Sequence, residues 1–176
     1  MFINVLRNFN HQEIKDQLIQ EISESQATSQ FLNNENITVT DYHTKVDEKK
    51  YRDTFFNAVG PSIDKIRNLY FCKKWEIHNF WFQQYQKNDN HGWHTHGGCQ
   101  WSLIYFVELP NKDISTEFYD TDAQQIIQPE VQEGDIIIFD SKAPHRSPKN
   151  TTDSRKTIIS ANLSLFDVDT TKLKNG

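Results

Sequence analysis

The segment that most constrains the fold begins at Lys74, where the sequence takes on the pattern of a long β-strand. Between Trp75 and Tyr85, large apolar residues occupy odd and even positions alike. Successive side chains of a strand point to opposite faces of its sheet. We therefore expect this strand to be covered on both faces and to lie between two layers.

Short strand-like segments continue this pattern toward the C-terminus, with turn residues between them. They are predicted at residues 93–96, 100–108, 114–119, 124–128, 135–139 and 155–166. Many short strands separated by turns are typical of a sandwich or barrel. The expected fold class is mainly β with N-terminal helices, in which a helical layer supports a C-terminal β-fold.

The N-terminal part has the periodicity of helices. After a short strand over residues 1–6, Asn10 and Glu13 form a capping-box pattern, and apolar residues then recur at every fourth position. This pattern predicts a helix over residues 11–25.

A second helical stretch is predicted to start near Lys49. Gly60-Pro61 is expected to interrupt it, because proline removes a helical hydrogen bond. A further turn or helix follows.

Composition and charge narrow the classes of partner. The 176 residues fit a single domain (1–176), with a helical support region over residues 1–73 and a β core over residues 74–168. A formal net charge of −5 with no long Lys/Arg stripe argues against nucleic acid as a partner. No apolar stretch approaches membrane-spanning length, and two cysteines make no disulfide framework, so we expect no membrane partner and a reducing cytoplasm. These features do not define the oligomeric state.

Three histidines stand in a pattern that suits a metal. His94 and His96 are two residues apart, so on an extended strand both point the same way. His145 follows the apolar strand of GDIIIFDSKAPHRS and would complete one face of a metal site on a neighbouring strand. Imidazole suits iron, zinc, copper and nickel, and open coordination positions favour catalysis. Arg155 offers a two-pronged partner for a carboxylate, which indicates a non-haem iron site with an anionic cosubstrate.

The remaining histidines are interpreted differently. His11, His43, His78 and His91 are expected to be hydrogen-bonded surface or core residues, although His91 lies on the loop that enters the site.

In order and spacing, three segments resemble the 2-oxoglutarate/Fe(II)-dependent dioxygenases, in particular the small bacterial and viral-type enzymes related to prolyl and aspartyl hydroxylases. The segments are WFQQYQKNDNHGWHTHGGCQWSLIYFVELP, EGDIIIFDSKAPHRSP and SRKTIISANLS. The resemblance covers residues 75–166 and implies a double-stranded β-helix, also called a jelly roll or cupin-like fold. It also implies Fe(II) as cofactor and 2-oxoglutarate as cosubstrate.

The resemblance assigns roles to individual residues. His94 and His145 match two iron ligands, and Arg155 matches the residue that pairs with the C5 carboxylate of 2-oxoglutarate. Thr157, two residues further along the same strand face, is expected to donate its hydroxyl to that carboxylate. The alternatives are that Arg155 forms a surface salt bridge and that Thr157 is an ordinary strand residue.

Two positions on the preceding strand complete the expected cosubstrate pocket. Gln83 and Tyr85 face the same way and are candidates to line it, with a core role as the alternative for Tyr85.

The sequence departs from the family pattern at His96, which stands where the family carries Asp or Glu. Three interpretations remain open: His96 is the third ligand, His96 turns away and water takes its place, or a carboxylate from elsewhere substitutes. Asp120 and Glu108 are the nearest carboxylates considered for the third interpretation. We favour ligation by His96, because imidazole is a good ligand and the two-residue spacing delivers it.

The resemblance implies an Fe(II)- and 2-oxoglutarate-dependent oxygenase. Its expected reaction hydroxylates a C–H bond of a protein side chain or small metabolite, consumes dioxygen, and releases succinate and CO₂. The alternatives are a cupin-type three-histidine metal dioxygenase that does not use 2-oxoglutarate, and a non-catalytic jelly-roll binding module.

Overall fold

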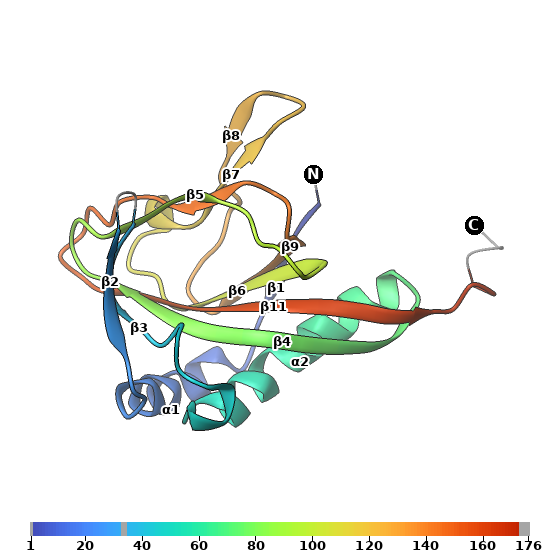
Figure 1. Cartoon of the computed structure of the whole chain (residues 1–176), viewed down its shortest axis with the longest axis horizontal. Helices are drawn as coiled ribbons and strands as arrows, with labels where there is room; N and C mark the ends of the chain where they lie inside the picture. Colours follow the sequence, from blue (N-terminus) through green and yellow to red (C-terminus); the bar gives the residue numbers. More distant parts are fainter. Residues whose placement is uncertain (1, 33–34, 173–176) are drawn as a thin grey trace.

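The chain folds into one curled antiparallel β-sheet with two helices packed against one of its faces (Figure 1). The computed structural model describes residues 2–32 and 35–172. The elements, in chain order, are β1 (Ile3–Arg7), α1 (His11–Ser23), β2 (Thr28–Leu32), β3 (Glu35–Thr40), η1 (Val46–Glu48), α2 (Arg52–Leu69), β4 (Cys72–Tyr85), β5 (Asn90–His94), β6 (Trp101–Glu108), η2 (Lys112–Ile114), β7 (Glu117–Asp120), β8 (Gln125–Ile127), β9 (Asp135–Asp140), β10 (His145–Ser147) and β11 (Lys156–Val168).

The sheet is continuous but curls over itself. Its order is β1-β9-β6-β11-β4-β3-β5-β10-β7-β8, and β2 pairs with β3 at the side. One end of β3 pairs with β4 and the other end pairs with β5. The larger layer therefore continues through β3 into the smaller layer β5-β10-β7-β8, which lies above it in Figure 1. This arrangement is that of a jelly-roll fold, and it confirms the predicted mainly β class.

The strand predicted to be covered on both faces, β4, is buried on both faces only from Phe80 to Tyr85, and its residues 73–79 are exposed or partly exposed. Its central neighbour β6 is buried on both faces. In β6, Leu103 and Tyr105 belong to an apolar core shared with the helices, while Ile104 and Phe106 belong to a second core inside the curl. The alternation of side chains along a strand divides these residues between the two cores. The curl therefore encloses its own interior, where polar side chains of β4 and β11 also point.

Helix α1 begins at His11 as predicted, but Asn10 makes no side-chain capping hydrogen bond. The predicted interruption at Gly60-Pro61 is wrong, because α2 runs unbroken from Arg52 to Leu69 with Pro61 inside it. A proline inside a helix costs about 3 kcal/mol. Burial of several apolar residues of α2 against the sheet offsets that cost; they are Phe55, Val59, Ile63 and Ile66.

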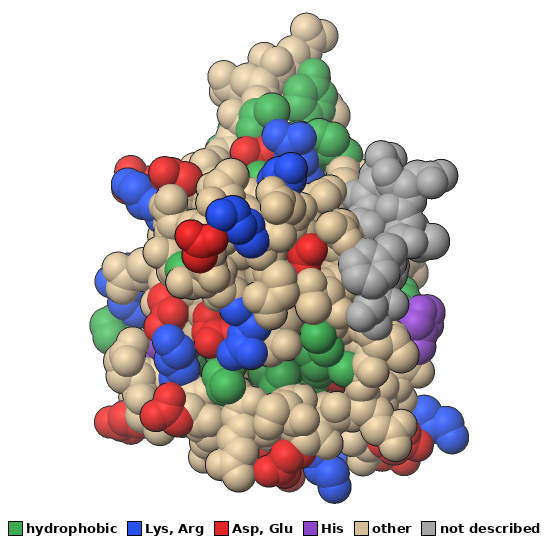
Figure 2. All heavy atoms as spheres, turned by 90° about the vertical axis from the view of Figure 1, so that its left-hand side faces the viewer, with side chains coloured by type: hydrophobic (Ala, Val, Ile, Leu, Met, Phe, Trp, Pro, Cys, Tyr) green, Lys and Arg blue, Asp and Glu red, His purple; other side chains and the backbone are tan. Residues whose placement is uncertain are grey.

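The first 73 residues contribute more than a helical layer. They also supply β1, which pairs with β9, and the hairpin β2–β3, which joins the two layers of the sheet. On the face shown in Figure 2, acidic and basic side chains are interspersed and do not gather by sign. Within residues 2–32 and 35–172, no helix is both long and apolar enough to cross a membrane.

Candidate metal centre

Strand pairing inside the curl brings the three histidines together. His94, at the end of β5, is the direct pairing partner of His145, at the start of β10. Directly opposed residues of an antiparallel pair present their side chains on the same face. His96 follows two residues after His94, and its backbone N–H donates to the carbonyl of Ser141 at 2.8 Å. That bond fixes the chain beyond the end of β5.

The three rings form a compact group. The ring centres of His94 and His145 are 4.2 Å apart, and those of His96 and His145 are 5.0 Å apart. One ligand nitrogen from each of the three lies within 4.8 Å of the other two. The predicted triad therefore comes together at one point.

Backbone carbonyls set the tautomers of two of these rings. Nδ1 of His94 lies 2.8 Å from the carbonyl oxygen of Gly92, and Nδ1 of His145 lies 2.9 Å from that of Ala143. A carbonyl oxygen only accepts, so each Nδ1 carries the proton. Nε2 then keeps its lone pair, which is the form that binds metals.

The third ring is oriented by side chains. Nδ1 of His96 lies 2.6 Å from Oδ1 of Asn162 and 2.9 Å from Oγ of Ser102. Ser102 in turn donates to the same amide oxygen at 3.0 Å. This network places the proton of His96 on Nδ1 as well, so all three histidines share one tautomer.

Burial keeps the site uncharged. It lowers the pKa of His145, and the neighbouring histidines lower it further. Burial also lowers the pKa of His96, although the hydrogen bond to Asn162 opposes that change. The pKa of His91 falls to about 3 for the same main reason. These imidazoles are neutral near pH 7, which is the protonation state that ligands of a metal need.

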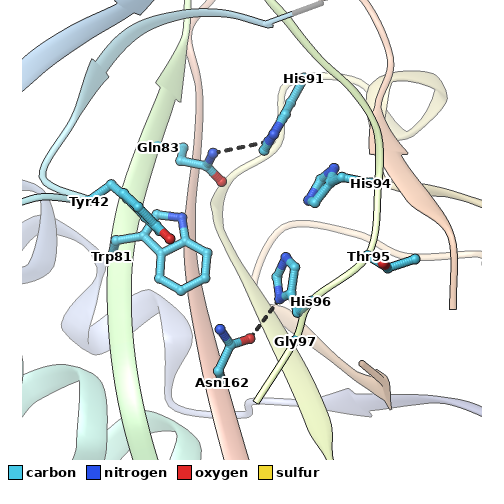
Figure 3. Close-up of a pocket in the computed structure, with 9 residues that line it drawn as sticks. All are labelled: Tyr42, Trp81, Gln83, His91, His94, Thr95, His96, Gly97 and Asn162. Atoms are coloured by element: carbon cyan, nitrogen blue, oxygen red, sulfur yellow. Dashed lines mark hydrogen bonds between the residues drawn. The ribbon is translucent and has the colours of Figure 1, made fainter. Parts of the chain in front are cut away.

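An outer chamber of about 310 Å³ opens beside the histidines (Figure 3). Tyr42 and Trp81 form an aromatic wall, with ring centres 5.1 Å apart. Trp81 also contacts His96, at 5.8 Å between ring centres. The nine described lining residues are Tyr42, Trp81, Gln83, His91, His94, Thr95, His96, Gly97 and Asn162.

A smaller inner cavity lies on the other side of the histidines. Its free volume of about 20 Å³ has room for about one water molecule. Gln83 and Tyr85 line it, where the sequence predicted the cosubstrate pocket. Ile158 and Ser160 of β11 also line it.

Lys156 is not itself among the described lining residues, but it lies behind the wall of this cavity and contacts two residues that line it, Ser147 and Tyr85. Its ammonium group donates to Oγ of Ser147 at 2.7 Å and to the carbonyl of Ile114 at 2.6 Å. It also lies 5.2 Å from the centre of the Tyr85 ring. Burial is the main influence on Lys156 and lowers its pKa to about 7, against a smaller opposing influence from Glu117. A completely buried lysine that the sequence did not single out therefore lies against the wall of the inner cavity.

Arg155 and Thr157, which were expected to bind the far carboxylate of 2-oxoglutarate, both bind the side chain of Glu108 in this structure. The guanidinium of Arg155 donates to both carboxylate oxygens of Glu108, at 2.8 and 2.9 Å, and the hydroxyl of Thr157 donates to the same carboxylate. Neither residue belongs to the described lining of the two cavities. The alternative considered for Arg155, a salt bridge, is what the structure contains.

The register of two strands explains this separation. Lys156 pairs directly with Tyr85, and Ile158 pairs with Gln83. Paired residues share a face, so a face that carries Gln83 and Tyr85 also carries Lys156 and Ile158. Arg155 and Thr157 have the opposite parity and point to the other face.

The other candidates lie outside the triad. Glu108 is held by Arg155 and Thr157, and Asp120 accepts hydrogen bonds from the backbone of a turn, so neither substitutes for His96. His11 and His78 are hydrogen-bonded to hydroxyl groups, as expected.

His91 differs from the expectation, because it lines both cavities and stacks on His94 with ring centres 3.9 Å apart. Its place on the loop entering the site was the only signal for this role.

Taken together, the fold and the cluster define a jelly-roll protein with a three-histidine centre inside its curl. No family model matches the chain, and no curated protein matches its sequence. Solved structures do match it, and three of them share 8–12% sequence identity with it.

One such structure is an oxidoreductase of the 2OG-Fe(II) oxygenase family from Burkholderia pseudomallei, with a TM-score of 0.75 and 8% identity over 92% of this chain and 85% of that one. A prolyl-4-hydroxylase from Pseudomonas putida has a TM-score of 0.66 and 10% identity, over 92% and 91%. A viral collagen prolyl hydroxylase from Paramecium bursaria Chlorella virus-1, in complex with 2OG, has a TM-score of 0.61 and 12% identity, over 93% and 96%. The resemblance predicted from the sequence is confirmed for the fold.

Proposed function

We propose that the chain is a 2-oxoglutarate-dependent non-haem iron oxygenase and that its curled sheet is a double-stranded β-helix. The observation that carries the proposal is the position of the three histidines. Their ligand nitrogens converge within 4.8 Å at the junction of two cavities, on a fold shared with 2OG-Fe(II) oxygenases.

The donor set fits a divalent iron. Three neutral imidazoles with Nδ1 protonated would hold Fe(II) through His94, His96 and His145, and they would leave further coordination positions open. At bond angles of about 90–110°, metal–nitrogen bonds of about 2.1 Å place neighbouring ligand nitrogens roughly 3.0–3.4 Å apart. The three nitrogens, which lie within 4.8 Å of one another, would therefore move together by up to roughly 1.5 Å to bind the ion.

The inner cavity is the proposed place of the cosubstrate. We assign the far carboxylate of 2-oxoglutarate to the buried ammonium of Lys156 in place of the predicted Arg155, with Tyr85 and Gln83 along the same wall. A carboxylate next to this ammonium would favour its charged form, because opposite charges stabilise each other in a low-dielectric site. The present volume of about 20 Å³ implies that side chains around Lys156 move apart when the ligand enters.

Bound together, Fe(II) and 2-oxoglutarate supply the chemistry in which dioxygen is consumed, succinate and CO₂ are released, and a substrate C–H bond is hydroxylated. The protein would hold the ligands in place and exclude water from the site. His96 is held by Asn162 and Ser102, and the inner cavity has apolar lining residues such as Ile104 and Ile158. The outer chamber is the proposed place of the substrate, either a protein side chain or a small molecule.

The proposal is tested by an anaerobic titration of the chain with Fe(II) and 2-oxoglutarate. We expect a weak visible charge-transfer band that requires both components, followed by succinate formation when dioxygen is admitted. His145→Ala should abolish both signals while its circular dichroism stays that of the parent. Iron binding with neither the band nor succinate would overturn the proposal.

A second candidate is a three-histidine metal dioxygenase that does not use 2-oxoglutarate. Two observations favour it: the uncharged ligand set and the small volume of the inner cavity. Oxygen consumption that depends on iron but not on 2-oxoglutarate would select this candidate. Neither kind of turnover, with metal binding retained, would select a non-catalytic binding module.

A further inference from the structure

Asn162 lies at the boundary between the histidine cluster and the outer chamber. Its Oδ1 accepts hydrogen bonds from His96 and Ser102. The amide therefore has a fixed orientation, and Nδ2 is on the side away from these partners. Figure 3 shows Nδ2 turned toward the Trp81 side of the chamber. Nδ2 has no hydrogen-bond partner within the described part of the chain.

Strand alternation along β11 turns the side chain of Asn162 into the curl. Asn162 lines the chamber on the same face as Ser160, whereas Leu163 belongs to the core beneath the helices. On the β6 side the pairing runs regularly through both Asn162 and Leu163, with Ser102 opposite Asn162. The register shift opposite Asn162 lies on β4, where His78 is the extra residue.

The opposite wall of the chamber is held rigidly. Tyr42 is half exposed and packs edge-on against Trp81. Its neighbour Asp41 is buried, and the Asp41 carboxylate accepts from the backbone N–H of Phe82 at 2.8 Å.

Two further groups hold the same carboxylate. Tyr51 donates its hydroxyl to Asp41 at 2.8 Å, and the ammonium of Lys49 lies 3.1 Å from it. This buried cluster fixes the loop that carries Tyr42 beside Trp81. The aromatic wall is therefore formed before any ligand binds.

We propose that Asn162 is a positioning residue for the substrate as well as for His96. Its Oδ1 holds the ring of His96, and its Nδ2 donates a hydrogen bond to an acceptor oxygen of the substrate. The substrate class is a group with a carbonyl or hydroxyl oxygen next to an apolar face, and that face packs on Tyr42 and Trp81. The inference deepens the proposed function by naming what the outer chamber takes.

A metal-free binding experiment tests this role independently of iron and 2-oxoglutarate. The probe is N-acetylpiperidine, which has an acceptor oxygen beside an apolar ring, and binding to the isotope-labelled chain is followed by NMR. We expect saturable binding that shifts the side-chain amide resonances of Asn162, which are identified by their loss in Asn162→Asp. The experiment contains neither iron nor 2-oxoglutarate, so its outcome does not depend on whether the proposed oxygenase activity is found.

The variants separate the two halves of the amide. Asn162→Asp keeps an acceptor oxygen for His96 but loses the Nδ2 donor. The affinity for the probe should therefore fall at least about fivefold. Asn57→Asp is the matched control, because it makes the same change at an exposed position of α2 and should bind like the parent. Tyr42→Ala should also weaken binding, through loss of the aromatic wall.

Parent-like affinity in Asn162→Asp would overturn the proposal, and so would a lack of saturable binding by the parent chain. If Asn162→Asp does not fold, as judged by circular dichroism, Asn162→Ala takes its place and should show the same loss. Retained Co(II) binding by Asn162→Asp is the accompanying readout. If Asn162→Asp removes the donor without disturbing His96, the affinity for the probe should fall and the affinity for Co(II) should stay that of the parent.

Discussion

Exchanging Lys156 for methionine tests the assignment of the cosubstrate carboxylate most directly. Methionine has a similar length and no charge, and the ammonium that it replaces is completely buried. A hydrogen bond to a charged group contributes about 1.5–3 kcal/mol. Since about 1.4 kcal/mol corresponds to a factor of ten, the affinity for 2-oxoglutarate should fall by roughly 10- to 150-fold.

The same exchange also affects the stability of the free protein. Lowering the pKa of Lys156 from 10.5 to about 7 corresponds to roughly 5 kcal/mol of destabilisation at pH 7, because each pKa unit is worth about 1.4 kcal/mol. Methionine removes that cost. It also leaves the Ile114 carbonyl and the Ser147 hydroxyl without their donor, at about 1–3 kcal/mol each. The two effects oppose each other, so we expect the free energy of unfolding to change by no more than about 3 kcal/mol.

The pH dependence of stability provides a second signature of Lys156. Between pH 7 and 10.5 the unfolded chain binds a proton on this lysine that the folded chain does not bind. The free energy of unfolding of the parent should therefore rise with pH in that window, by up to about 1.4 kcal/mol per unit. Lys156→Met should lack this contribution.

Arg155→Met is the matched control for the affinity measurement. It removes the half-buried pair with Glu108, which should reduce stability by about 1 kcal/mol and leave the affinity for 2-oxoglutarate unchanged. Both variants are titrated with 2-oxoglutarate in the presence of Fe(II) without oxygen. If Arg155→Met weakens the binding of 2-oxoglutarate as much as Lys156→Met does, then Lys156 is not the residue that binds the far carboxylate, and the assignment from strand register is refuted.

Three further predictions concern the histidines. His94→Ala and His145→Ala should each lose most Fe(II) affinity with the fold intact, and undiminished binding in an iron titration would remove that residue from the site. His96→Asp should keep Fe(II) binding and measurable succinate formation, because Asp is an accepted third ligand delivered from the same position; a variant with no iron affinity would contradict this. Acidification below about pH 6.5 should destabilise the metal-free chain, because the unfolded chain binds a proton on His145 that the buried ring does not take up. The slope should be about 1.4 kcal/mol per pH unit for this residue, and urea titrations of His145→Gln should lack that share.

The sequence predicted that His94, His96 and His145 come together, and their ligand atoms do converge. The two-residue spacing is only part of the reason, because β5 ends at His94 and a tertiary bond from His96 N–H to the carbonyl of Ser141 holds the chain beyond it.

Which of Arg155 and Lys156 faces the inside of the curl depends on the register of β11 against β4. A shift of one residue moves every side chain of a strand to its other face, so spacing from a distant histidine cannot make that choice. The partner strand contained the missing signal, because Tyr85 fixes the parity of Lys156.

The errors in the fold have a similar origin. Pro61 disfavours a helix locally, but burial of neighbouring apolar residues against the sheet decides the outcome, and that burial is tertiary. The hairpin β2–β3 was not predicted, because its role is to join the two layers of the sheet. Elements whose stability comes from distant partners leave little trace in local periodicity.

Because the three histidine ligands are neutral, Fe(II) and 2-oxoglutarate are expected to strengthen each other's binding. An iron held by His94, His96 and His145 alone would keep its full charge of +2 inside a buried site, which is unfavourable. Dianionic 2-oxoglutarate would balance that charge, with its far carboxylate next to the ammonium of Lys156. Each component should therefore strengthen the binding of the other, and by linkage the two factors must be equal.

A coupling of 1–3 kcal/mol, typical for linked sites, corresponds to about 5- to 150-fold. The measurement is the Fe(II) dissociation constant with and without saturating 2-oxoglutarate, under exclusion of oxygen, together with the reciprocal titration. His96→Asp supplies one negative charge from the protein, so the mutual strengthening should be smaller in this variant than in the parent. Equal coupling in both proteins would mean that His96 does not face the ion, and the two-histidine site with water in the third position would then be the better account.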